Sequence, residues 1–298
     1  MATSTQPPTA VLNSSTAVVH LEYDMNNPPA LPGPASEWTR FVCLSDTHCR
    51  AFPVPPGDVL LHSGDLTNIG TLSEFRGAIG WLQTLPHKHK IIIAGNHDVT
   101  LHNHDGWYDA NYQRWHRRGK ENTASVRNLL RNAKNKGIVY LQEEQHEFQA
   151  KPYGKVWSVY GFPWSPFHRN WAFNYYRENA DQIISTIPKT DILLTHAPPY
   201  EILDIGSRNE RAGCKALAAQ VEYLRPQLHV FGHIHEDHGA EIHEWTGSED
   251  AGERSVFVNA ANKPYGPKAR TSGGGLVPFG TGVYSPVIVD LYDPVERT

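Results

Sequence analysis

The segment RFVCLSDTH, residues 40–48, begins as a continuous apolar run over Arg40–Leu44 and ends in Asp46 and His48. A short apolar run of this kind is typical of a strand that is buried on both faces. Residues two positions apart in an extended segment point the same way, so Asp46 and His48 can face one site. The segment therefore predicts a buried strand with two potential metal ligands at its carboxyl end.

Four further apolar runs also lead into residues that can bind a metal. Each run, with the residues that follow it, is Asp58–Leu61 with Asp65, Lys90–Ala94 with Asn96, Asp191–Leu194 with His196, and Leu228–Phe231 with His233 and His235. One such residue alone is equally well explained by a helix cap, a turn or a buried structural histidine. Sites assemble at the carboxyl ends of strands in open α/β sheets, so the full set predicts a metal site.

Helical patterns separate many of these apolar runs. The predicted helices are Thr71–Leu85, Thr123–Lys136, Trp171–Ile187 and Ala212–Leu224, and the remaining predicted strands are Ile138–Leu141, Val156–Gly161, Ser255–Val258 and Val283–Leu291. Thr71 and Glu74 form a capping-box pattern, and Gly137 is placed to end the second helix. The alternation of apolar strands with helices predicts an α/β fold whose strands are covered on both faces.

Composition restricts the class of protein. Hydrophobic residues make up 39% of the 298 residues and charged residues 19%, which is a globular balance. The net charge of −4 disfavours a protein that grips long nucleic acids. The sequence contains no run of 18 apolar residues, so it predicts no membrane span. The three cysteines argue against a disulfide framework and suit a reducing compartment, so we expect a cytoplasmic protein.

Residues 1–37 are rich in Ser, Thr, Pro and Ala, and residues 38–298 read as one domain. The apolar stretches of the first segment are too short for a signal peptide, and no basic region precedes them. We interpret it as an N-terminal arm that is mobile or lies on the surface. The alternative is an ordered strand around Ala17–Tyr23 that pairs with the edge of a sheet.

The ordered motifs of the strand ends resemble the signature of the calcineurin-like metallophosphoesterase superfamily. They read DTH at 46–48, GD at 64–65, GNHD at 95–98, TH at 195–196 and GHIH at 232–235. The resemblance extends from Thr39 to Leu291 and is closest to the metallophosphoesterase-domain branch, which is like the class III phosphodiesterases. The segments GFPWSP at 161–166, LTHAPP at 194–199 and LHVFGHIHE at 228–236 are similar to that branch. Asp98 stands where the branch often has Glu, and the glycine-rich segment 271–282 has no counterpart.

The resemblance implies a four-layer sandwich in which helices flank two central mixed β-sheets, with a dinuclear metal site at the carboxyl ends of the strands. The two implied ligand sets share Asp65: one is Asp46, His48, Asp65 and His235, and the other is Asp65, Asn96, His196 and His233. It also implies that His97 donates a proton or a hydrogen bond to the phosphate ester and that Asp98 orients His97.

The chemistry of these side chains fits that implication. Two divalent ions about 3.5–4 Å apart need a shared anionic ligand to offset their repulsion, and a buried aspartate supplies one. Oxygen and nitrogen ligands without thiolate suit Mn²⁺, Fe, Zn²⁺ or Ni²⁺, and we expect two such ions with a preference for Mn²⁺. Of the other histidines, His62 reads as a buried structural imidazole. His87, His89, His102, His104, His116, His238 and His243 read as surface residues.

Substrate contacts are expected from the aromatic segment that follows residue 162. Trp164, Phe167 and Trp171 could stack on a planar group, and Arg169 could pair with an anion. The alternative is that this segment folds onto a small aromatic core. We expect a small-molecule substrate, a phosphoester or a planar organic anion, and neither a long nucleic acid nor a membrane as a partner.

The sequence predicts hydrolysis of phosphomonoesters or phosphodiesters, with cyclic nucleotides among the candidates. One alternative is that the same metal centre acts as a Lewis acid on a planar substrate without phosphate. The other alternative is a metal-bound scaffold that binds a nucleotide or a protein with little turnover. The complete set of ligands favours an enzyme over the scaffold.

Overall fold

The computed structural model describes residues 11–103, 105–245, 253–264 and 283–294. Its first sheet has the order β1-β2-β15-β3-β4-β5-β6, in which β3 to β6 run parallel and β15 runs antiparallel to both of its neighbours. The bounds of these strands are β1 Val11–Asn13, β2 Ala17–His20, β3 Trp38–Leu44, β4 Val59–His62, β5 His89–Ile93, β6 Ile138–Leu141 and β15 Val287–Tyr292.

The second sheet has the order β13-β14-β12-β11-β8-β7, with four parallel central strands and an antiparallel strand at each edge. Its strands are β7 Glu144–Gln149, β8 Val156–Phe162, β11 Ile192–Thr195, β12 Leu228–Phe231, β13 Gly239–Glu244 and β14 Arg254–Asn259. A short parallel pair, β9 Ser165–Pro166 and β10 Asn174–Tyr175, lies outside both sheets.

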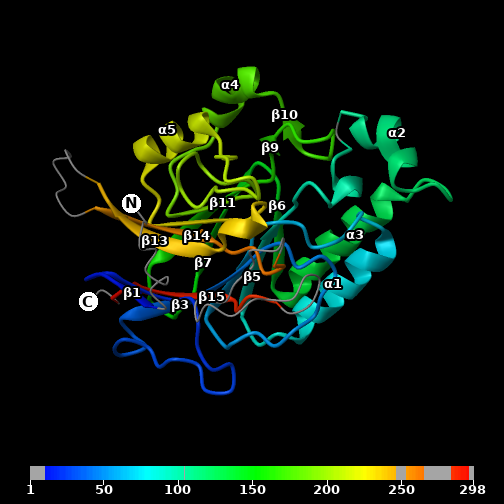
Figure 1. The fold of residues 1–298 in the computed structure, drawn as a ribbon. Helices are drawn as coiled ribbons and strands as arrows, with labels where there is room; N and C mark the ends of the chain where they lie inside the picture. Colours follow the sequence, from blue (N-terminus) through cyan, green and yellow to red (C-terminus); the bar gives the residue numbers. More distant parts are fainter. Residues whose placement is uncertain (1–10, 104, 246–252, 265–282, 295–298) are drawn as a thin grey trace.

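Helices cover the outer face of each sheet (Figure 1). The α-helices are α1 Leu72–Thr84, α2 Trp107–Asn111, α3 Thr123–Ala133, α4 Ala180–Ile184 and α5 Lys215–Leu224. Short 3₁₀ turns lie at Val99–Leu101, Tyr112–Arg114, Lys134–Lys136, Arg177–Asn179 and His235–Asp237. No helix among the described residues is long and apolar enough to cross a membrane.

Three apolar clusters hold the layers together. The central cluster lies between the two sheets, where the Phe41 ring meets Trp157 with centroids 5.1 Å apart. The second cluster packs the first sheet against α1 and α3, and the third packs the second sheet against α4 and α5. The predicted four-layer sandwich of two mixed sheets is therefore confirmed.

The local helix signals match the structure. Thr71 accepts a hydrogen bond from the Glu74 backbone N–H, and the Glu74 carboxylate accepts one from the Thr71 N–H, which completes the capping box of α1. Gly137 takes a left-handed backbone conformation with φ of 74° immediately after the turn that follows α3. Both predicted helix ends are confirmed.

The predicted helix over Trp171–Ile187 is wrong for its first half. Asn174 and Tyr175 pair with β9, and α4 begins only at Ala180. Phe173, immediately before β10, has a positive φ of 51°, and its ring enters the second apolar cluster, while Tyr175 on β10 enters the third. Burial of these two aromatic rings in different layers overrides the helical pattern.

Smaller differences from the predictions concern the start of α5, two edge strands and three histidines. Helix α5 begins at Lys215 rather than Ala212, because Cys214 forms a bridge with Pro199 and the Gly213 N–H donates to the Asp204 carboxylate. The edge strands β7 and β13 are too polar to be predicted from apolar runs. Of the histidines interpreted as exposed, His87, His102 and His116 are buried.

Part of the N-terminal segment forms strand β2, which corresponds to the alternative interpretation of an ordered strand around Ala17–Tyr23. Ala17–His20 pairs with β15, and β1 pairs with the other edge of β2. The division at residue 38 therefore separates two strands of the same sheet. The glycine-rich segment 271–282 lies outside the described residues.

Candidate metal centre

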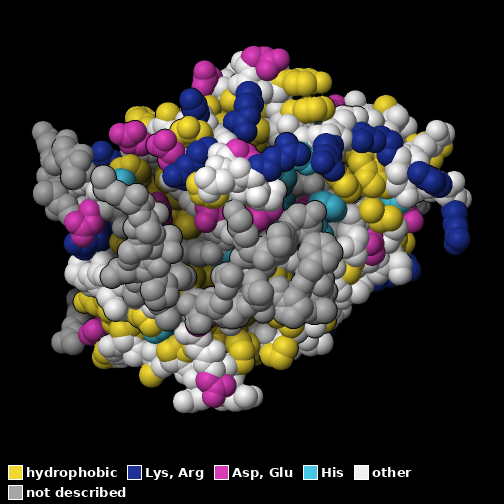
Figure 2. Space-filling model, in the orientation of Figure 1, with side chains coloured by type: hydrophobic (Ala, Val, Ile, Leu, Met, Phe, Trp, Pro, Cys, Tyr) yellow, Lys and Arg dark blue, Asp and Glu magenta, His cyan; other side chains and the backbone are white. Residues whose placement is uncertain are grey.

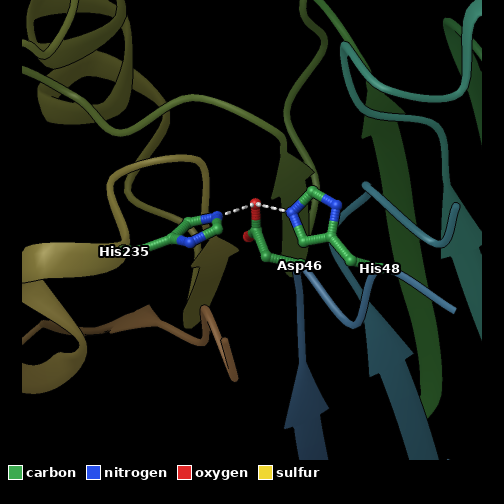
Figure 3. A group of neighbouring side chains, drawn as sticks. All are labelled: Asp46, His48 and His235. Carbon is green, nitrogen blue, oxygen red and sulfur yellow. Dashed lines mark hydrogen bonds and ion pairs between the residues drawn. The ribbon is translucent and has the colours of Figure 1, made fainter. Parts of the chain in front are cut away.

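The predicted ligands converge from the carboxyl ends of strands in both sheets. Asp46 follows β3, and its Oδ2 accepts a hydrogen bond of 3.0 Å from the His233 backbone N–H beyond β12. Its Oδ1 lies 2.9 Å from His235 Nε2, so the carboxylate stands between histidines from opposite sheets (Figure 3). A single buried aspartate thus links the two halves of the sandwich at this edge.

His48 fits a metal better than it fits its protein neighbours. Its side chain is buried, and neither ring nitrogen has a hydrogen-bond partner. Its Nε2 lies 4.0 Å from Asp46 Oδ1 and 3.7 Å from Asp65 Oδ2, too far for a hydrogen bond to either. A buried imidazole without partners is costly, and a cation between these three side chains would remove that cost.

Asp65 presents its two oxygens to different partners. Oδ2 is the oxygen near His48, whereas Oδ1 lies 3.6 Å from His196 Nε2 and accepts a 2.7 Å hydrogen bond from the His97 N–H. Asp65 also belongs with Asp46 and His196 to a group whose ligand atoms all lie within 4.8 Å of one another. This arrangement suits the ligand shared by two cations, which is the role that the sequence resemblance implied for Asp65.

His196 and Asn96 form the other side of the site. The Ser63 carbonyl accepts from His196 Nδ1 at 2.9 Å, so a single ring proton resides on Nδ1 and leaves the Nε2 lone pair available to a cation. That Nε2 lies 2.9 Å from Asn96 Oδ1, which is also an acceptor. A nitrogen lone pair and a carbonyl oxygen that face each other in this way can both coordinate one cation. The His233 ring lies 5.0 Å from the His196 ring.

Backbone geometry at the site is specialised. Asp46, His48, Asp65 and His233 all have positive φ, between 45° and 67°, a region that non-glycine residues rarely adopt. Such strain is typical of functional sites, where the surrounding structure holds residues in unfavourable conformations. Gly95 and Gly232 stand beside them because a Cβ at either position would overlap an Asp65 or Asp46 carboxylate oxygen.

The two aspartates have opposite electrostatic tendencies. Burial opposes ionisation of Asp46, but the charge and hydrogen bond of His235, aided by His196 and His48, hold its pKa well below its usual range. Burial raises the pKa of Asp65 well above its usual range, and repulsion from Asp46 adds to this effect. A divalent cation beside both carboxylates would offset that repulsion and stabilise the charged form of Asp65.

His97 lies at the edge of this group, within 4.8 Å of His48 and Asp65 by their ligand atoms. The Asn68 carbonyl accepts from its Nδ1 at 2.7 Å, and the Trp171 ring stacks on the imidazole with centroids 4.0 Å apart. The expectation that Asp98 orients His97 stays a prediction, because no hydrogen bond joins their side chains among the described residues. The buried Asp98 carboxylate instead accepts hydrogen bonds from the loop backbone at Leu66, Thr67 and Gly95 and from the Thr67 hydroxyl.

The four predicted substrate contacts do not converge. Trp171 lies against His97, but Trp164 packs its edge onto the His102 and Phe173 rings within the apolar clusters. Phe167 and Arg169 are exposed, and Phe167 stacks on Tyr176. For Trp164 the alternative of a small aromatic core is therefore the better description.

Sequence reasoning missed the neighbours that hold His97 and Trp171. Asn68 acts through its backbone carbonyl, which leaves no signal in the sequence. Trp115 lies 5.1 Å from Trp171 between ring centroids, although the two are far apart in the chain. Only the dense basic and aromatic run at residues 112–120 could have drawn attention to it.

The site and the fold together define a class of protein. A family model for calcineurin-like phosphoesterases matches residues 39–237, and the chain belongs to this family. It is accordingly a phosphoesterase hydrolase of a family that uses divalent metal ions.

The chain is similar to several individual proteins. The chain is 37% identical over 250 residues to human metallophosphoesterase domain-containing protein 1, covering 79% of this chain and 71% of that protein. It is 33% identical over 275 residues to a UPF0046 protein of Caenorhabditis elegans, covering 87% of this chain and 83% of that protein. Among solved structures, phosphopantetheinyl hydrolase from Mycobacterium tuberculosis matches with a TM-score of 0.44 at 15% identity, covering 76% and 90%.

Proposed function

We propose that the protein hydrolyses small phosphomonoesters or phosphodiesters, cyclic nucleotides among them, at a centre of two divalent cations that share Asp65. The observation that carries this proposal is the position of Asp65, whose two oxygens face His48 on one side and His196 on the other. Family membership supports phosphoester chemistry, and the partnerless nitrogens of His48 support metal binding.

The residues present supply two sets of donors. Asp46, His48 and His235 would hold one cation together with Asp65, and three of these ligand atoms already lie within 4.8 Å of one another. Asn96, His196 and His233 would hold the second. When bound, divalent cations would polarise the phosphoryl oxygens and lower the pKa of water. Oxygen and nitrogen donors suit Mn²⁺, Fe, Zn²⁺ or Ni²⁺ and do not choose among them, and Mn²⁺ is the ion we propose to test first.

His97 is the proposed proton donor to the leaving oxygen. The Asn68 carbonyl fixes the proton on Nδ1, so any second proton resides on Nε2, the atom free to reach the substrate. Stacking of Trp171 holds the ring and excludes water from one of its faces. Burial lowers the pKa of His97, so the donor form is populated at lower pH than for a free histidine and releases its Nε2 proton more readily.

Metal content tests the centre. Protein loaded with Mn²⁺ should carry close to two ions per chain by elemental analysis, and Asp65→Asn should lower occupancy at both positions because it removes their shared anion. His62→Gln is a matched control, because His62 is buried nearby and bonds Thr47 rather than facing the ligand group. One ion or none in the loaded wild-type protein would defeat the dinuclear proposal.

Turnover tests the chemistry. His97→Ala should retain both metals and lose about 10²–10⁴-fold in kcat on bis-para-nitrophenyl phosphate or a cyclic nucleotide. A wild-type protein that holds both metals but cleaves no phosphoester above the metal-only background would instead favour a substrate without phosphate. If His97→Ala loses a metal, His97 is a ligand and its assignment as proton donor fails.

A further inference from the structure

A basic surface lies beside the candidate metal centre, in a chain whose net charge is −4. Residues 114–120 contain Arg114, Arg117, Arg118 and Lys120 and no acidic residue. Figure 2 shows Lys and Arg side chains in a row across the face on which Figure 1 places α2 and the β9–β10 pair. This concentration of positive charge has no role in the chemistry described above.

Only some of the basic side chains in this segment have a partner within the protein. Lys120 pairs with Asp109 at 2.7 Å, and Arg114 donates to two backbone carbonyls. Arg117 and Arg118 are exposed, and no acidic side chain among the described residues lies within 4.0 Å of either guanidinium. Two guanidinium groups are thus left to bind an anion from outside the chain.

These two arginines line a shallow depression of about 460 Å³. Its other lining residues are Tyr112, Gln113 and Gly119, and none of the five is acidic. Paired guanidinium groups beside a phenol and a carboxamide are suited to the oxygens of a phosphate, because every one of these side chains can donate a hydrogen bond. The lining of the depression is therefore suited to an anion.

Two anchors fix the depression relative to His97. The buried His116 bonds the Ile69 carbonyl at 2.9 Å through Nε2 and the Tyr108 hydroxyl at 2.5 Å through Nδ1. Ile69 is the neighbour of Asn68, whose carbonyl holds His97. One loop therefore positions both the candidate proton donor and the arginine segment.

The second anchor runs through the aromatic segment on the other side of His97. Arg114 donates to the carbonyls of Arg169 and Asn170 at 2.8 Å and 2.6 Å, and its guanidinium lies 4.8 Å from the Trp115 ring centroid. Asn170 immediately precedes Trp171, which contacts both His97 and Trp115. A continuous line of rings therefore leads from the candidate metal centre to the basic segment.

We propose that Arg117 and Arg118 bind a second phosphate group of the substrate while the candidate metal centre holds the scissile phosphoester. This inference rests on the proposed function and narrows its substrate class to compounds that carry two separated phosphate groups. Trp171 and Trp115 supply an apolar surface for the part of the substrate that joins them. The second phosphate belongs either to a small bisphosphate or to the backbone of a short single-stranded oligonucleotide.

The experiment compares Arg117→Ala/Arg118→Ala with Arg76→Ala/Arg131→Ala, which removes the same charge from exposed arginines on α1 and α3. The probes are adenosine 3′,5′-bisphosphate, adenosine 5′-monophosphate and a four-nucleotide single-stranded RNA, each with Mn²⁺-loaded protein. KM is measured for a compound that is hydrolysed, and Kd by calorimetry for one that is not. Circular dichroism melting checks that both double variants fold.

In the wild-type protein and in the α1/α3 control, the bisphosphate or the RNA should bind more tightly than the monophosphate. Arg117→Ala/Arg118→Ala should weaken that preference by about tenfold or more, the scale of one lost charge-assisted hydrogen bond. Dependence on the two arginines for the RNA alone, with a steep salt dependence, would assign the second phosphate to an oligonucleotide. Dependence for the bisphosphate would assign it to a small molecule.

The proposal is overturned if neither compound is preferred over the monophosphate, or if the arginine pair and the control pair behave alike. The failure of the proposed function is a different result. Absence of turnover with retained, arginine-dependent binding of a bisphosphate would contradict the proposed hydrolysis of these substrates and leave the second phosphate site standing.

Discussion

Asp98 joins the two loops that carry Asp65 and Asn96. Its carboxylate is fully buried and accepts four hydrogen bonds, three from backbone N–H groups of the loops after β4 and β5 and one from the Thr67 hydroxyl. Burial raises its pKa to about 6 against the effect of those bonds. The side chain therefore joins the loop that carries Asp65 to the loop that carries Asn96.

Asp98→Asn should consequently act on stability. The carboxamide offers one oxygen where the carboxylate offers two, so at least one buried N–H loses its acceptor at a cost of about 1–3 kcal/mol. Urea denaturation of the metal-loaded variant should show this loss, and Asp181→Asn, at an exposed position in α4, should show little change. Unaltered stability with a reduced kcat would instead return Asp98 to the role of orienting His97.

His229 is a buried histidine that should make the stability of the fold depend on pH. Its Nε2 lies 2.8 Å from the Thr195 hydroxyl, which itself donates to the Ala197 carbonyl, so Nε2 carries the proton. Its Nδ1 has no hydrogen-bond partner, and burial lowers the pKa of the ring to about 3. The folded protein therefore holds His229 neutral where an unfolded chain would protonate it below its ordinary pKa of about 6.5.

Stability should therefore decline as the solution is acidified. Above pH 6.5 neither state binds this proton, and below it the unfolded state does, which costs at most about 1.4 kcal/mol per pH unit until the folded pKa is reached. His229→Gln keeps a donor to Thr195 and cannot titrate. Its free energy of unfolding should fall less steeply between pH 6.5 and pH 4.5 than that of wild type, and parallel curves would refute the assignment.

At the scale of elements, the segment from β9 to β10 joins two layers and the candidate site. Trp164 packs against both outer apolar clusters, whereas Trp171 packs against the second cluster alone and stacks on His97. Phe173, with φ of 51°, donates its N–H to His102 Nδ1 at 2.9 Å, which fastens the segment to the chain that follows the His97 motif. Two tryptophans seven positions apart thus serve different purposes.

Substitutions should distinguish the packing role of Trp164 from the role of Trp171 beside His97. Trp164→Ala should lower the free energy of unfolding by about 2–4 kcal/mol, because it removes a ring packed in two clusters. Trp171→Ala should have a smaller effect on stability and should change KM or kcat, because it uncovers His97. Phe167→Ala, at an exposed ring, is the control. Equal losses of stability in both tryptophan variants would show that Trp171 is also a core residue.

At the scale of the whole molecule, the two ends of the described chain complete the first sheet. β15 pairs with β3 on one side and with β2 on the other, and β2 buries Val19 in the central cluster. Without β2, the long edge of β15 would expose its backbone groups and part of that cluster. Exposed edges of this kind promote association between chains.

Truncation should reveal this dependence. Removal of residues 1–20 takes away β1 and β2 and should lower the melting temperature and favour aggregation. Removal of residues 1–16 spares β2 and should cost much less, because β1 is only partly buried. Light scattering and thermal melting of the two truncated proteins test this, and similar behaviour of both would show that β2 contributes little.

The sequence by itself determined the elements whose signals are local. A continuous apolar run such as β12, predicted over Leu228–Phe231 and observed over the same residues, needs only its own side chains to specify a buried strand. The capping box of Thr71 and the left-handed Gly137 are equally local. The order of ligand-type residues after successive strands was sufficient to indicate the edge at which the candidate metal centre forms.

Tertiary structure alone decided what joins residues distant in the chain. The Asn68 carbonyl that holds His97, the Trp171 ring stacked on it and the four donors around Asp98 leave no spacing or composition signal, because backbone groups and long-range contacts have no sequence period. The departure of Phe173 and Tyr175 from the predicted helix arose for the same reason, since burial in two different layers outweighed a local helical pattern. Local propensity is weak against burial of large side chains, so the positions of these residues depend on the assembled layers.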